Sequence, residues 1–252
     1  MSTHPLLPKL RKLKLSGMLQ TLDVRVAQAD ERQLNSMEFL ALLLDDELER
    51  REQQHLAHSL GISGCDSLKT LTQFDFLAAP AINRILIQEL ATCTFIARHE
   101  NILFCGPTGV GKSHLANALA IEALKRNYRV LCKPTHRLLN DLHAARATGA
   151  YARLMTRVLH CDLLVLDDFG LQALAPQAVQ DLYEIITERY ERGSLIITSN
   201  RAFEEWAEVF NNDLLASAAL DRLTHHTHTL TFRGDSFRQR SRKKEVAPTL
   251  SV

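Results

Sequence analysis

Long apolar runs, paired cysteines and a strong net charge are all missing from this sequence of 252 residues. No stretch approaches the ~20 apolar residues of a transmembrane helix, and the basic start from Met1 to Gln20 is too polar for a signal peptide. The five cysteines are scattered without a C-x-x-C pair, which favours free thiols in a reducing compartment. The sequence therefore predicts a cytoplasmic protein that does not use a membrane.

The net charge of +1 conceals two basic ends. Residues 1–29 carry five basic side chains and one acidic side chain, a local charge of +4, and residues 233–245 carry six basic and two acidic, again +4. Such ends suit the phosphate backbone of DNA, although a solvated charge run without a partner is an equally open interpretation. Nucleic acid is therefore a candidate partner.

Apolar spacing predicts that the N-terminal part of the chain is wholly helical. Leu10 to Leu22 suit one amphipathic helix, and a second helix opens at Ser36, a candidate N-cap. The second helix is expected to turn five apolar residues inward: Phe39, Leu40, Leu43, Leu44 and Leu48. We therefore expect a helical DNA- or partner-binding domain over residues 1–65. A linker and a helix from about Pro80 to Ala97 are expected over residues 66–97.

From Asn101 onwards, short apolar strands alternate with helices. Strands are expected at Asn101–Cys105, Arg129–Lys133, Asp162–Asp167, Ser194–Ser199 and Thr227–Phe232. Helices are expected at Lys112–Arg126, Thr135–Leu159 with an interruption near Gly149, and Pro176–Arg192, with shorter helices from Phe203 and Asp213. Strands separated by such helices predict an α/β domain over residues 98–252, with a parallel five-stranded sheet covered on both faces.

The octapeptide from Gly106 to Ser113 matches G-x-x-x-x-G-K-[ST] between an expected strand and an expected helix. Its glycines let successive backbone N–H groups face a phosphate, while Lys112 reaches the β- and γ-phosphates and Ser113 ligates Mg²⁺. We therefore predict an ATP site formed by Gly106, Pro107, Thr108, Gly109, Val110, Gly111, Lys112, Ser113 and His114.

Two further strand ends carry polar residues suited to the same site. One strand ends in Asp167, predicted to hold Mg²⁺, and is followed by Asp168, predicted to polarise the attacking water. The next strand leads to Asn200, the expected contact to the γ-phosphate or the water, with Thr198 and Ser199 as weaker candidates. Capping of the following helix is the alternative role for Asn200.

Several motifs together resemble the IstB-like helper ATPases of bacterial insertion sequences, relatives of the DnaC-type helicase loaders. The resemblance covers nearly the whole chain and rests on the P-loop, LLVLDDFG (163–170), DLYEIITERYER (181–192), IITSNR (196–201) with Glu205-Trp206, and LDRL (220–223). It implies an AAA+ core and an ATP-controlled homo-oligomer on double-stranded DNA that serves a transposase. It also implies that Arg222 completes the ATP site of a neighbouring subunit; an ordinary surface arginine is the alternative.

Few residues follow the last expected strand, too few for a lid domain with a core of its own, so no C-terminal lid is expected. Arg238 or Arg240 is a candidate substitute for the arginine that such a lid carries. No zinc-finger or helix-turn-helix pattern is present, so DNA binding is expected to be weakly sequence-selective. The candidate DNA contacts are Lys9, Arg11, Lys12, Lys14, Arg146 and Arg153.

Alternatives remain open at this point. A replicative helicase loader would use its N-terminal helix to bind a helicase, and a small-molecule kinase would be a monomer that requires a phosphoacceptor. His225, His226 and His228 have no carboxylate or cysteine partner in their spacing, so exposed histidines are favoured over a metal site. Trp206 is expected in the core.

Overall fold

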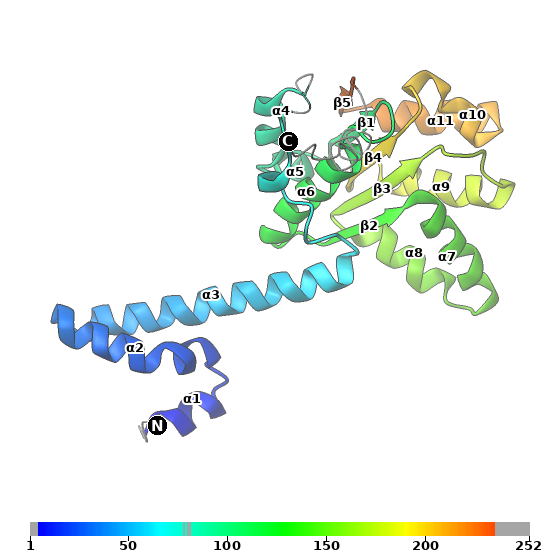
Figure 1. Ribbon diagram of the computed structural model, residues 1–252. Helices are drawn as coiled ribbons and strands as arrows, with labels where there is room; N and C mark the ends of the chain where they lie inside the picture. Colours follow the sequence, from blue (N-terminus) through cyan, green and yellow to red (C-terminus); the bar gives the residue numbers. More distant parts are fainter. Residues whose placement is uncertain (1–4, 78, 80–81, 235–252) are drawn as a thin grey trace, which may run out of the picture. The chain divides into compact units, whose positions relative to one another are not determined.

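The computed structural model describes residues 5–77, 79 and 82–234. The chain divides into two compact units, residues 1–59 and residues 60–252. Figure 1 shows the first unit as helices and the second as a sheet with helices around it. Among the helices described, none is both long and apolar enough to span a bilayer.

The first unit contains α1 (Leu7–Lys12), α2 (Ser16–Arg32) and most of α3 (Ser36–Ser63). The prediction of one helix over Leu10–Leu22 is wrong, because Lys14 has a left-handed φ of 56° and separates α1 from α2. α2 and α3 approach closely at Gly17, where an added Cβ would lie 2.5 Å from the backbone oxygen of Asp46. The Gly17 amide donates to the Glu47 carboxylate at 2.7 Å and fixes this contact.

The start of α3 is capped one residue earlier than predicted. Asn35, rather than Ser36, supplies the cap, because its Oδ1 accepts from the amides of Met37 and Glu38, each at 3.0 Å. The Glu38 carboxylate in turn accepts from the Asn35 amide at 2.8 Å. This reciprocal pair is a capping box, which satisfies amides that the first helical turn leaves without partners.

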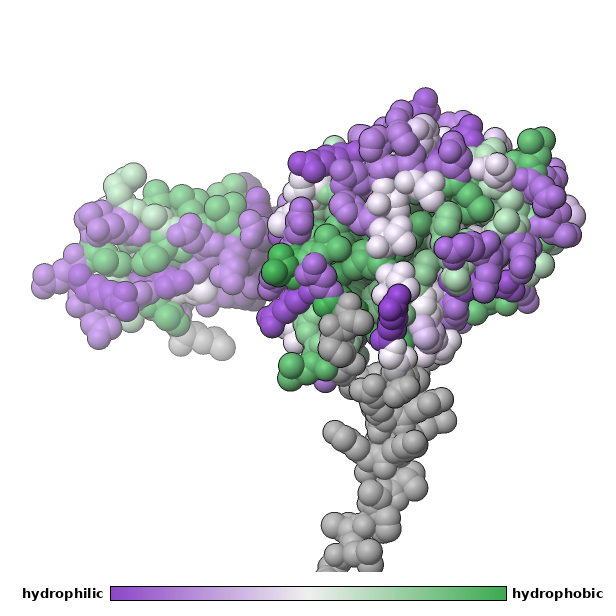
Figure 2. Space-filling view, turned by 90° about the horizontal axis from the view of Figure 1, so that it is seen from above, coloured by the Kyte–Doolittle hydropathy of each residue, from purple (hydrophilic) through white to green (hydrophobic). Residues whose placement is uncertain are grey.

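The apolar side chains of α3 are divided between a small core and the surface. Leu43 packs with Met18 and Leu22 in the core of the first unit. The prediction that three neighbouring leucines also face inward is wrong, because α1 and α2 cover only one side of α3. These side chains are 45–57% exposed: Leu40, Leu44 and Leu48. Figure 2 shows apolar residues at the surface of this unit among polar ones.

The second unit is organised around a parallel five-stranded sheet with the order β2-β3-β4-β1-β5, which confirms the predicted fold class. Its strands are β1 (Asn101–Cys105), β2 (Val130–Pro134), β3 (Leu163–Phe169), β4 (Ser194–Ser199) and β5 (Thr227–Thr231). Because β4 lies between β1 and β3, the residues that follow these three strands meet at one edge of the sheet.

Helices cover both faces of the sheet (Figure 1). α6 (Lys112–Lys125) packs on one face. The main core on the other face includes side chains from α7 (Thr135–Ala147), α8 (Tyr151–His160), α9 (Pro176–Arg189), α10 (Ala207–Phe210) and α11 (Asp213–Thr224). Trp206, between the 3-10 helix η2 (Phe203–Glu205) and α10, is fully buried in this core, as predicted.

Two helical stretches are divided by residues with positive φ. The predicted helix over Pro80–Ala97 is two short helices, α4 (Arg84–Leu90) and α5 (Thr94–Ala97), because Cys93 has a φ of 63°. The interruption predicted near Gly149 is confirmed between α7 and α8, where this glycine has a φ of 70°. The predicted absence of a lid concerns residues 235–252, which also include Arg238 and Arg240 and lie outside the described residues.

Candidate nucleotide-binding site

The loop between β1 and α6 has the backbone of a phosphate cradle. Gly106, Gly109 and Gly111 have φ values of 140°, 84° and 100°, which residues with a side chain rarely adopt. A Cβ on Gly106 would lie 2.4 Å from the backbone oxygen of Phe232, and one on Gly111 would lie 2.7 Å from the Phe74 ring. The loop leads directly into α6, whose first amides have no partners within the helix and suit an anion.

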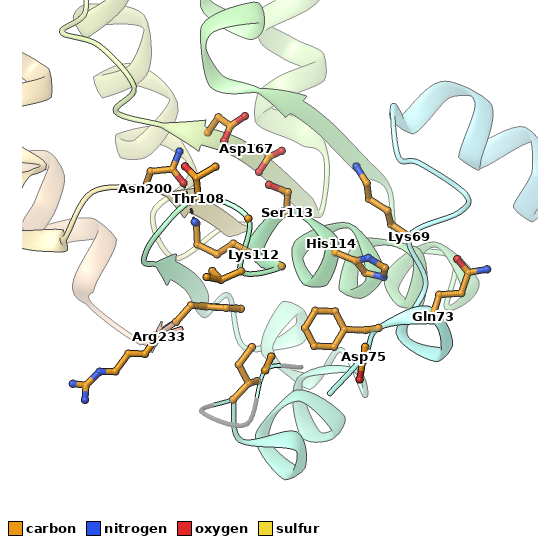
Figure 3. Close-up of a pocket in the computed structure, with 18 residues that line it drawn as sticks. Lys69, Gln73, Asp75, Thr108, Lys112, Ser113, His114, Asp167, Asn200 and Arg233 are labelled. Carbon is orange, nitrogen blue, oxygen red and sulfur yellow. Dashed lines mark hydrogen bonds between the residues drawn. The ribbon is translucent and has the colours of Figure 1, made fainter. Parts of the chain in front are cut away.

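Lys112, the first residue of α6, joins the P-loop to the end of β4. Its side chain is only 5% exposed. The Nζ atom donates to the backbone oxygens of Gly106 and Pro107 at 2.7 Å each. It also donates to Oδ1 of Asn200 at 2.8 Å, as Figure 3 shows. Two residues predicted from separate motifs are therefore in direct contact. An arriving phosphate would replace these acceptors around the ammonium group.

The end of β3 brings two carboxylates to the same place. The pairing of β3 with β4 is interrupted between Leu166 and Phe169, and Asp168 has a φ of 54°. Fully buried Thr198 of β4 bridges this irregularity: its hydroxyl donates to the Asp167 carboxylate and accepts from the Asp168 amide at 3.0 Å. Thr198, a weaker candidate for touching phosphate, thus holds both acidic residues in place.

A cavity of about 360 Å³ extends from the P-loop to a segment that the sequence marks only as a linker. Lys112, Ser113, Asp167 and Asn200 border it on the P-loop side (Figure 3). The opposite wall includes four residues in or beside the 3-10 helix η1 (Leu71–Gln73): Lys69, Gln73, Phe74 and Asp75. Neither a motif nor apolar spacing identifies this wall, because contacts with distant residues place it there.

Side chains of α6 attach this segment to the P-loop helix. Asn117 accepts from the Asp66 amide at 2.8 Å and donates to the backbone oxygens of Asp66 and Lys69 at 2.7 and 3.1 Å. The Nε2 atom of His114 lies 2.8 Å from the backbone oxygen of Thr70. His114, predicted to contact nucleotide, lines the cavity and also positions its opposite wall.

Arg222 lies on α11 and is absent from the described residues that line the cavity of its own chain. Its Nη1 donates to the backbone oxygen of Ala218 at 2.6 Å, and its guanidinium carbon lies 5.9 Å from the centre of the Tyr183 ring. The side chain is half-buried. Within the described residues, Arg222 therefore does not border the cavity of its own chain.

The candidate DNA contacts differ in their surroundings. Arg153 on α8 is exposed, as are the four basic residues in and after α1: Lys9, Arg11, Lys12 and Lys14. Arg146, by contrast, forms an ion pair with Asp181, which is 1% exposed. The guanidinium carbon of Arg146 lies 3.8 Å from the centre of the Tyr151 ring. Moving Arg146 to DNA would leave a buried carboxylate without its counter-charge. The structure therefore shows Arg146 in an ion pair within the protein, and its contact with DNA stays a prediction.

Replacing Thr198 by valine is expected to weaken the Mg²⁺ dependence of nucleotide binding. The change removes the donor to Asp167 and the acceptor for the Asp168 amide, a loss of ~1–3 kcal/mol or roughly 5- to 150-fold. A Mg²⁺ titration of ATP affinity measures the effect. Thr198→Ser restores the hydroxyl and is expected to behave as the wild type. An unchanged titration with Thr198→Val would contradict the positioning role.

The sheet order, the P-loop and this cavity define the class of the protein as a P-loop protein with an AAA+-like fold. The DnaC helicase loader has a similar fold, with a TM-score of 0.52 and 23% identity over 59% of this chain and 87% of that chain. The replication initiator DnaA, solved with AMPPCP and single-stranded DNA, has a TM-score of 0.56 and 22% identity over 74% of this chain and 58% of that chain.

Residues 8–245 match the family of IstB-like ATP binding proteins, and the chain belongs to this family. A protein of insertion sequence IS21 from Pseudomonas aeruginosa, named for ATP binding, is 36% identical over 241 residues. That alignment covers 96% of this chain and 91% of the relative. The resemblance predicted from the motifs is thereby confirmed.

Proposed function

We propose that the chain is a cytoplasmic ATPase that uses MgATP to assemble on double-stranded DNA and assist a transposase. The contact of Lys112 with Asn200, beside the Thr198–Asp167 pair, is the observation that carries the proposal. This arrangement brings together the Lys112 ammonium group, which suits the phosphates, the Asp167 carboxylate, which suits Mg²⁺, and the Asn200 amide. ATP hydrolysis by P-loop proteins uses groups of these three kinds. The insertion-sequence relative supports the transposition setting.

In the proposed complex the triphosphate lies on the amides of the P-loop and the first turn of α6. Ser113 and Asp167 both border the cavity, and their hydroxyl and carboxylate are hard oxygen donors that suit Mg²⁺. Bound Mg²⁺ would neutralise charge that develops on the phosphates. Asp168 would polarise the attacking water, and Asn200 would orient it. Phe74 on the opposite wall would face the nucleoside.

We propose that Arg222 acts on the γ-phosphate of a neighbouring subunit. Its position outside the cavity of its own chain supports a role across a subunit boundary. An assembly of this kind would make hydrolysis depend on contact between subunits. ATP would then be turned over only where the protein has assembled.

The exposed cations of α1 and the following turn are the proposed DNA contact. Lys9, Arg11, Lys12 and Lys14 concentrate four positive charges within six residues. Contacts of such side chains with phosphates give salt-sensitive binding with little sequence preference. Arg153 on α8 is a second proposed contact.

Sizing the protein with MgATP, with and without duplex DNA, across a salt series tests this function. We expect DNA to promote assembly, with an affinity that falls steeply as salt increases. Changing Lys9, Arg11, Lys12 and Lys14 to alanine together should reduce the slope of log affinity against log salt by up to about 3.6. A matched control removes the same charge from exposed residues of the second unit: Arg98, Lys125, Arg126 and Arg192.

A replicative helicase loader is the second candidate function, favoured by the fold similarity to DnaC. In that case the basic residues of α1 would bind a helicase subunit. Unchanged DNA binding by the α1 variant, with loss of helicase binding, would favour the loader. If the control variant, with alanine at Arg98, Lys125, Arg126 and Arg192, also lost DNA binding, the result would count against a specific role of α1.

A further inference from the structure

Three side chains with metal-binding chemistry meet outside the nucleotide cavity. Glu191 follows α9, and His225 and His226 follow α11. One ligand atom from each residue lies within 4.8 Å of those of the other two, and all three residues are exposed. The sequence spacing leaves the histidines without a carboxylate partner. The fold supplies one by bringing the ends of two helices together.

Both loops of this cluster are fixed to buried parts of the second unit. The backbone oxygen of His226 accepts from the Asn101 amide at 3.0 Å, where β1 begins beside β5. On the other side, Arg189 is 1% exposed and donates to the backbone oxygen of Ser194 at 2.8 Å, closing the turn that contains Glu191. The backbones of both loops are therefore held, and the three exposed side chains supply the ligand atoms.

We propose that Glu191, His225 and His226 form a binding site for a divalent transition metal, with zinc as the expected ion. Two imidazole nitrogens and one carboxylate oxygen form a donor set typical of Zn²⁺ and its neighbours, and less suited to Mg²⁺ or Ca²⁺. Donor atoms around a tetrahedral zinc ion lie ~3.4 Å apart, so the present separations need only a modest contraction. A fourth position stays open to water.

The surroundings of the cluster favour a cation. Two helices, α9 and α11, end beside it, and carboxyl ends of helices carry partial negative charge. The Tyr190 hydroxyl lies 2.8 Å from Nδ1 of His225, and the same ring nitrogen lies 3.9 Å from Oε1 of Glu191. His228 is not part of the cluster, because its Nε2 lies 2.9 Å from the Glu100 carboxylate. A bound ion would tie together the ends of α9 and α11, the helix that carries Arg222.

Calorimetric titration of the full chain with zinc chloride tests the site. The protein is freed of any affinity tag, treated with a chelator and kept reduced without nucleotide. We expect a zinc site in the wild type whose affinity falls at least ~10-fold in both His226→Ala and Glu191→Gln. His228→Ala is the matched control and should bind zinc as the wild type does.

Cobalt absorption and ATP binding complete the test. Co²⁺ bound by nitrogen and oxygen donors should give visible bands in the wild type and in His228→Ala that are lost in His226→Ala. ATP affinity should be equal in all variants, which checks that each has folded. Equal zinc affinity in the wild type, His226→Ala and Glu191→Gln would overturn the proposal, as would the absence of zinc binding to the wild type.

Discussion

Replacing Lys112 by alanine is expected to weaken ATP binding by about 100-fold and to abolish nucleotide-dependent assembly. The Nζ atom lies among the backbone oxygens of Gly106 and Pro107 and Oδ1 of Asn200, at the point where the cradle meets β4. Alanine leaves the glycine backbone in place but removes the cation that would contact the β- and γ-phosphates. Calorimetry with ATP measures the affinity, and light scattering measures the assembly.

Lys125→Ala is the matched control for this change. Lys125 lies in the last turn of the same helix, is exposed and pairs with Glu122 at 2.7 Å. Its loss should leave ATP binding unchanged. If Lys112→Ala bound ATP with the affinity of the wild type, the result would contradict the proposed nucleotide site and the function that rests on it.

Arg222→Ala is expected to retain ATP binding and to lose hydrolysis by about 1,000-fold. The expected loss is large because an arginine placed on the γ-phosphate neutralises charge in the transition state. Binding should survive because Arg222 does not line the cavity of its own chain in the described structure. ATP affinity and the rate of phosphate release, both measured with DNA present, separate the two effects.

Mixing two inactive variants distinguishes action between subunits from action within one. Asp168→Asn should bind ATP without hydrolysing it, yet its Arg222 can complete the site of an Arg222→Ala neighbour. The mixture should therefore regain part of the wild-type rate, while each variant alone stays inactive. Arg192→Ala, which removes an exposed arginine paired with Glu188, controls for loss of charge. Normal turnover by Arg222→Ala alone would eliminate the proposed contact.

The P-loop side of the cavity is predictable from the sequence because its residues belong to contiguous motifs. Glycines at positions 106, 109 and 111, followed by Lys112 and placed between a strand and a helix, are typical of a phosphate-binding loop. Asp167 and Asn200 are predictable for another reason. Polar residues at the carboxyl ends of neighbouring parallel strands lie together at one edge of the sheet. The direct contact of Lys112 with Asn200 follows from that regularity once β1 and β4 are neighbours.

The remaining parts of the site carried no local signal. Phe74 and Asp75 lie in a segment without periodicity, and they reach the cavity because Asn117 and His114 bind its backbone. The sequence favours Asn200 over Thr198 because it cannot show that the Thr198 hydroxyl spans Asp167 and the Asp168 amide. Apolar spacing overestimates the burial of α3 for a similar reason. Apolar spacing identifies a face, but the partner helices decide how much of that face is covered.

By itself, the amino-acid sequence determined the P-loop, the alternation of strands and helices and the family, because these depend on neighbours along the chain. Only the tertiary structure decided the strand order, the second wall of the cavity, the ion pair of Arg146 and the meeting of Glu191 with two histidines. Each of these depends on residues that are far apart in the chain, and the packing of the sheet and helices brings them together.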